Sequence, residues 1–125
     1  MFTVTKDFNF EAAHSLPHLP PEHKCSRLHG HSYRFRVEVD GYLDHRGFVI
    51  DYAEIAEAVR PIVQRLDHRN LDELFDFHTT AENLARWLFD EIGKDLPVSR
   101  IVFFETSTTR VVFPTSHANK HQQCS

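Results

Sequence analysis

The stretch CSRLHGHSYRFRVEV, residues 25–39, alternates apolar and polar side chains from His31 onward. Consecutive side chains of a β-strand point to opposite faces of the sheet, so His29 and His31 share one face, with Gly30 between them. Every second residue after His31 is apolar, and the two histidines therefore continue the apolar face. The pattern predicts a half-buried strand over residues 31–42 that carries imidazoles where it begins.

A first strand is predicted over residues 2–13, where most even-numbered positions are apolar. His14 follows in the same phase as these apolar positions. If the two strands pair, His14, His29 and His31 converge on one face. Three histidine ligands leave a fourth tetrahedral position open for water or substrate, as in catalytic zinc sites, whereas a closed structural site would recruit Cys25 as the fourth ligand.

The remaining sequence completes an α+β domain. We expect a proline-rich loop over residues 16–26 and, after a turn at residues 44–47, a short strand over residues 47–50. Two helices are expected over residues 51–66 and 79–92, and a final hairpin over residues 100–105 and 110–113. Asp51 is a suitable N-cap for the first helix, and Thr79 with Glu82 forms a capping box for the second. Strands at both ends with two helices between them predict an antiparallel sheet, with strand order ββ(β)ααββ along the chain, covered by the helices on one face.

Composition excludes several classes of function. A chain of 125 residues fits one domain, and its net charge of −4 gives no basic footprint and disfavours nucleic-acid binding. Neither an apolar run of about 18 residues nor a signal-peptide pattern occurs, so we expect no membrane association and a cytoplasmic location. Two cysteines do not form a disulfide framework, and Cys25 would remain a thiol in a reducing compartment.

Two further places carry reactive side chains. Asp67 adjoins His68 after the first helix, and an aspartate can hold an imidazole in the tautomer that a general acid or base needs; alternatively, His68 is a solvated residue at a helix C-terminus. Glu105 ends an apolar strand, where a buried carboxylate would need a pair of donors such as an arginine or the amino-pyrimidine edge of a heterocycle. The alternative for Glu105 is a carboxylate at the strand end that faces water.

Five motifs occur in the order found in the 6-pyruvoyl-tetrahydropterin synthase superfamily. They are Phe8 to His14 (FNFEAAH), Cys25 to His31 (CSRLHGH), Leu66 to Leu71 (LDHRNL), Thr79 to Asn83 (TTAEN) and Phe104 to Thr106 (FET). The resemblance runs from about residue 2 to residue 113. Three residues separate Cys25 from His29, which resembles the bacterial 6-carboxy-5,6,7,8-tetrahydropterin synthases of the queuosine pathway.

The resemblance implies a zinc-dependent lyase that converts 7,8-dihydroneopterin triphosphate to 6-carboxy-5,6,7,8-tetrahydropterin and releases acetaldehyde and triphosphate. It also implies the role of each candidate residue: His14, His29 and His31 as zinc ligands; Cys25 as general base; Asp67 and His68 as a proton relay; Glu105 as the anchor of the pterin ring; and Thr106, Thr79 and Thr80 as pocket-lining residues. A 6-pyruvoyl-forming or other side-chain lyase, and a non-catalytic pterin- or zinc-binding module, are the alternatives. The proposed base and relay argue against a mere binder.

The same resemblance implies the tunnelling fold, in which the sheets of several subunits join into a barrel. We therefore expect a homohexamer, a dimer of trimers, with active sites at subunit interfaces. Residues 1–113 are expected to form a single domain. Residues 114–125 are expected to form a flexible tail, which contains His117, His121 and Cys124.

Overall fold

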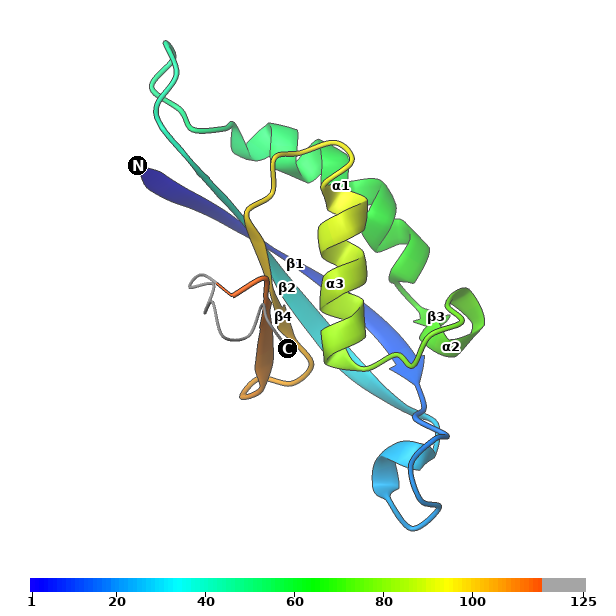
Figure 1. The fold of residues 1–125 in the computed structure, drawn as a ribbon. Helices are drawn as coiled ribbons and strands as arrows, with labels where there is room; N and C mark the ends of the chain where they lie inside the picture. Colours follow the sequence, from blue (N-terminus) through cyan, green and yellow to red (C-terminus); the bar gives the residue numbers. More distant parts are fainter. Residues whose placement is uncertain (116–125) are drawn as a thin grey trace.

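The computed structural model describes residues 1–115, and these form one five-stranded sheet with helices on one face (Figure 1). The strands lie in the order β3-β1-β2-β4-β5. The two longest are β1 (Phe2–His14) and β2 (His29–Gly41), which pair antiparallel along their whole length. Strand β4 (Arg100–Phe104) continues the sheet beside β2, and β5 (Arg110–Phe113) forms the edge.

The helices cover the face on which the apolar residues of β1 and β2 lie. Helix α1 (Tyr52–Leu66) and helix α3 (Ala81–Ile92) lie side by side over the sheet (Figure 1). The largest side chains between these layers are those of Phe10, Tyr33, Phe35 and Phe103, each at most 2% exposed. The predicted α+β class, with helices on one face of the sheet, is confirmed.

Three short elements complete the chain. Helix η1 (Lys24–Ser26) lies in the β1–β2 loop, and helix α2 (Leu71–Leu74) precedes α3. Strand β3 (Arg69–Asn70) pairs in parallel with the end of β1, which the sequence analysis did not predict. Among residues 1–115, no helix combines the length and the apolar character that crossing a membrane requires.

Two local predictions are wrong. Residues 47–50 form no strand, because the segment is a turn in which the Asp44 carboxylate accepts hydrogen bonds from the main-chain N–H groups of Arg46 and Phe48. The N-cap of α3 is Thr80, whose hydroxyl accepts from the N–H of Asn83. Thr79 instead points inward, where it is hydrogen-bonded to His14 and Asp72. His117, His121 and Cys124 of the predicted tail lie outside the described residues.

Candidate metal centre

Three histidines meet where β1 ends and β2 begins. His14 lies directly opposite His29 in the antiparallel register, and His31 lies two pairs further along β2, opposite Ala12. Their ring centroids are 4.6 to 5.1 Å apart, and one ring nitrogen from each lies within 4.8 Å of the others. The convergence inferred from the alternation of the two strands is therefore present in the fold.

Hydrogen bonds orient two of these rings. The Nδ1 of His14 is 2.8 Å from the carbonyl oxygen of Thr79, and the Nδ1 of His29 is 2.7 Å from that of Arg27. Since a carbonyl oxygen can only accept, Nδ1 carries the proton in both rings and Nε2 keeps a lone pair. A main-chain carbonyl on the far nitrogen is the usual support of a metal-binding imidazole.

Two further ring nitrogens of the cluster are buried and unsatisfied. Within residues 1–115, the Nε2 atoms of His14 and His31 have no hydrogen-bond partner. Burial lowers the pKa of both rings, because desolvation disfavours the imidazolium. Neutral imidazoles with lone pairs facing one another are the donor set of a zinc site. The three residues therefore fit a metal ion, and Cys25 is not part of the cluster that the described residues form.

The carboxylate of Asp72, which no sequence motif indicated, supports this cluster through residues that adjoin or hold His14. The Oδ1 of Asp72 accepts a 2.8 Å hydrogen bond from the hydroxyl of Thr79, and its Oδ2 accepts bonds of 2.8 and 2.7 Å from the N–H and hydroxyl of Ser15. Asp72 thus ties the residue after His14 to the residue whose carbonyl holds the His14 ring. No local pattern indicates this role, because the partners lie 57 and 7 residues away in the sequence.

Glu105 lies just beyond the end of β4, on the side of the sheet that carries the histidines. Its Oε1 is 3.9 Å from the Nε2 of His31, and its side chain is 29% exposed. Glu105, Thr106 and His31 line a cavity of about 550 Å³, which also reaches Tyr33 and Arg34. The Tyr33 hydroxyl is buried and has no partner among the described residues. The structure thus brings the predicted ring anchor next to the predicted metal ligands.

Cys25 and the pair Asp67–His68 lie on other segments. Cys25 is a half-buried free thiol in η1. Asp67 caps α1 and accepts a 2.8 Å bond from the N–H of Glu11 in β1, while its other oxygen is 2.9 Å from the Nδ1 of His68. His68 has a left-handed backbone, with φ of 59°, and a side chain that is 78% exposed. Hydrogen bonding to the Glu11 N–H, and secondarily to His68, lowers the pKa of the Asp67 carboxyl.

The Asp67–His68 pair is therefore formed, but no hydrogen bond or ion pair within residues 1–115 joins it to the three histidines. His68 and His31 do line one cavity of about 560 Å³, on which Ser32 and Arg69 also border. Of the predicted pocket residues, Thr80 caps α3, Thr79 is 1% exposed behind His14, and the Thr106 hydroxyl is 2.6 Å from that of Thr109.

Comparison with known proteins places this geometry in a family. A 38% identical relative from Synechocystis, matched over 74% of this chain and 75% of its own, is named 6-carboxy-5,6,7,8-tetrahydropterin synthase. A 37% identical relative from Pyrococcus furiosus, matched over 71% and 73%, is named dihydroneopterin monophosphate aldolase. The solved 6-pyruvoyl tetrahydropterin synthase of Caenorhabditis elegans superposes with a TM-score of 0.82 at 26% identity, over 92% of this chain and 96% of that one.

The family profile described as 6-pyruvoyl tetrahydropterin synthase matches residues 3–116, which includes all three histidines and Glu105. The match also extends over β1, β2 and both long helices, so it covers the scaffold as well as the site. On the sequence match and on the shared fold, the chain belongs to the 6-pyruvoyl tetrahydropterin synthase family.

Proposed function

We propose that this chain is a zinc-dependent lyase that converts 7,8-dihydroneopterin triphosphate to 6-carboxy-5,6,7,8-tetrahydropterin, with release of acetaldehyde and triphosphate, in the cytoplasmic synthesis of queuosine. The relative from Synechocystis, at 38% identity, carries the name of this activity. The short spacing between Cys25 and His29 also supports the carboxy-forming branch. The proposal therefore has two parts: the chain acts as a pterin side-chain lyase, and its product is 6-carboxy-5,6,7,8-tetrahydropterin.

One observation carries this proposal: the Glu105 carboxylate lies 3.9 Å from a histidine of the three-histidine cluster. An acceptor for the ring and a site for the side-chain oxygens would then lie next to each other. A zinc ion on His14, His29 and His31 would polarise those oxygens and acidify the neighbouring C–H and O–H groups. Glu105 would accept two parallel N–H bonds from the amino-pyrimidine edge and fix the ring.

Cys25 would take the proton in this scheme, and the Asp67–His68 pair would pass protons on. Asp67, bonded to Nδ1 of His68, keeps the other ring nitrogen available for transfer. Thr106 would line the pterin pocket beside Glu105, and Thr80 would border it at the start of α3. Thr79 would act through His14, whose ring its carbonyl holds.

The proposed assembly is a homohexamer, a dimer of trimers, in which His68 serves a neighbouring subunit. The 78% exposure of its side chain supports this arrangement, as does the outer edge of β5, which pairs with no other strand of residues 1–115. Sedimentation velocity tests it: a hexamer is expected, and a monomer that retains full activity would contradict the shared site.

A second candidate is formation of 6-pyruvoyl-tetrahydropterin, which the likeness to the Caenorhabditis elegans synthase favours. The Pyrococcus furiosus relative is named for a monophosphate substrate, so the number of phosphates on the substrate must also be tested. The purified protein should therefore be incubated with dihydroneopterin triphosphate and, separately, with the monophosphate, and the products identified by mass. A 6-carboxy product from the triphosphate supports the proposal. A 6-pyruvoyl product supports the second candidate, and binding without turnover would leave a non-catalytic module.

A further inference from the structure

The loop between β1 and β2, residues 15–28, is held together by its own hydrogen bonds. The N–H of Leu16 donates to the carbonyl oxygen of Cys25 at 2.8 Å, which closes the loop across its width. The N–H of His23 donates to Pro20 at 2.9 Å, and the His23 ring accepts from the N–H of Cys25 at 3.1 Å. The segment that carries the thiol is therefore a small unit with its own internal order.

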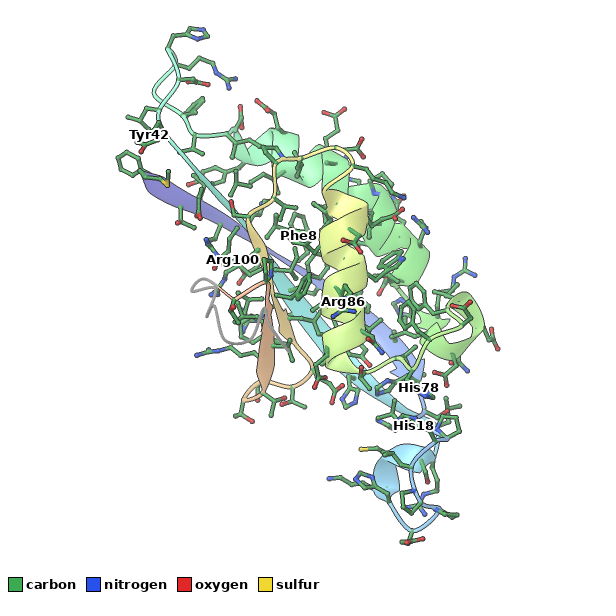
Figure 2. All side chains as sticks on the ribbon, in the orientation of Figure 1. Phe8, His18, Tyr42, His78, Arg86 and Arg100 are labelled. Atoms are coloured by element: carbon green, nitrogen blue, oxygen red, sulfur yellow. The ribbon has the colours of Figure 1, made fainter. Side chains whose placement is uncertain are left out.

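This loop is fastened to the rest of the protein at its two ends. Ser15 is bonded to Asp72 at one end, and the carbonyl of Arg27 accepts from the His29 ring at the other. Between these ends, the ring of His18 stacks on the ring of His78, with centroids 3.7 Å apart and planes 28° apart (Figure 2). Within residues 1–115, no other hydrogen bond, ion pair or ring contact joins the interior of the loop to the rest of the chain.

We propose that the stack of His18 on His78 is a positioning contact for Cys25. His18 lies in the turn that the Leu19 N–H closes on the carbonyl of Leu16 at 3.1 Å, and Leu16 in turn binds the Cys25 carbonyl. A displacement of the His18 ring is therefore transmitted to the residue that bears the thiol.

The other ring of the stack belongs to the frame of the metal centre. His78 directly precedes Thr79, whose carbonyl holds the ring of His14. The stack thus connects the thiol-bearing loop to the segment that orients a proposed metal ligand. Both rings belong to exposed residues, so the contact contributes little to the packing of the core. Its effect is on the position of the β1–β2 loop.

The inference rests on the proposed function, in which Cys25 is the general base. A base must lie within hydrogen-bonding reach of the proton that it removes, and a misplacement of about 1 Å can cost about 100-fold in rate. Loss of the stack should therefore lower turnover more than it lowers substrate binding. It should also make the half-buried thiol easier to reach, because the loop opens more often.

The test uses the full-length zinc-loaded protein with Cys124→Ser, so that Cys25 is the one thiol. His78→Ala and His18→Ala are compared with His78→Phe, which keeps a flat ring, and with His45→Ala, an exposed histidine of the 44–47 turn. Both alanine variants are expected to lose about tenfold in kcat with a smaller change in KM, and to react about threefold faster with iodoacetamide. His78→Phe should largely restore both values, zinc content should not change, and the double variant should be no worse than either single one.

Unchanged iodoacetamide reactivity in both alanine variants would overturn the inference. Loss of zinc in His78→Ala would also overturn it, because the residue would then support His14 rather than the thiol. The alkylation rates do not depend on the reaction catalysed. If the protein forms no product from dihydroneopterin triphosphate, the proposed function fails while the alkylation rates still decide the role of the stack.

Discussion

The ring of His14 is hydrogen-bonded through Nδ1 to the carbonyl oxygen of Thr79, at 2.8 Å, and this bond joins the end of β1 to the segment before α3. The bond fixes the His14 tautomer, so the buried Nε2 lone pair faces the other two histidines. The site therefore depends on the hydrogen bonds that hold the histidine rings as well as on the histidines themselves. Substitutions can test these two contributions separately.

Substitution of a ligand should abolish metal binding. The protein is expected to hold about one zinc per chain, and His29→Ala should lose it, because two imidazoles leave too few ligands for tight binding. Zinc content after gel filtration, measured by elemental analysis, checks this. His45→Ala, which removes an exposed histidine, should retain the metal. Full zinc occupancy in His29→Ala would refute the three-histidine assignment.

Removal of the supporting carboxylate should weaken the same site without removing a ligand. Asp72→Ala leaves Ser15 and the Thr79 hydroxyl without their acceptor, so the free energy of unfolding should fall by about 1–3 kcal/mol. Zinc affinity should fall by about 10- to 100-fold, as for other second-layer partners of metal-binding histidines. Urea denaturation and competition with a chelator measure the two effects. Asp76→Ala, an exposed neighbour, serves as the control, and equal zinc affinity in the two variants would contradict the role of Asp72.

The thiol should be needed for turnover and not for binding. Cys25→Ala is expected to keep its zinc and its affinity for a pterin ligand while kcat falls by at least about 100-fold, because a base outside the metal shell acts on proton transfer. Elemental analysis and steady-state kinetics separate the two, with Lys24→Ala in the same loop as the control. Loss of zinc would make Cys25 a ligand of a closed site, and a loss of only a few-fold in rate would remove it as the base.

Alternation along β1 and β2 predicts the histidine cluster well, because a period of two fixes which side chains share a face and long strands keep their phase. The helices are predicted for a similar reason, since their apolar stripes are long. The predicted strand at residues 47–50 is wrong because the side-chain bonds of Asp44 favour a turn there. Strand β3 is only two residues long, too short to show an alternating pattern in the sequence, and it is defined by its pairing with β1.

The supporting residues were beyond the reach of sequence patterns. Thr79 matched a capping box, but the hydrogen bonds to His14 and Asp72 turn it inward and leave the cap to Thr80. Asp72 has no motif of its own. These roles depend on which distant segments the folded chain brings together, and that information lies in tertiary contacts.

An ion pair on the other face of the sheet should make stability depend on acid pH. Arg100, and secondarily Thr3, hold the pKa of the Asp40 carboxyl below its usual range through hydrogen bonds. A depressed carboxyl pKa stabilises the fold above the unfolded value of about 3.9, and this contribution is lost as pH falls through the folded value. The excess stability of the wild type over Asp40→Asn in urea should therefore shrink below about pH 4. Asp95→Asn, at an exposed position, should show no such trend, and a pH-independent difference for Asp40→Asn would rule out the effect.

Glu105 should decide pterin affinity without affecting the metal. Its carboxylate is half-buried and lines the same cavity as His31, and it has no hydrogen-bond partner among the described residues, so two acceptor oxygens are available to a ligand. Glu105→Gln keeps the shape but replaces one acceptor by a donor that faces a donor. A hydrogen bond to a charged group is worth roughly 1.5–3 kcal/mol, so the affinity for a pterin should fall by at least about tenfold while zinc stays bound.

Calorimetric titration of the zinc-loaded protein with a pterin measures this directly, with Glu57→Gln on the exposed side of α1 as the matched control. A dihydropterin without the phosphorylated side chain should lose the same factor, because Glu105 would contact the ring and not the side chain. Unchanged affinity in Glu105→Gln would make this carboxylate a solvated strand end. The pterin ring would then have to bind elsewhere, while the three-histidine assignment would stand, since the hydrogen bonds that orient His14 and His29 do not involve Glu105.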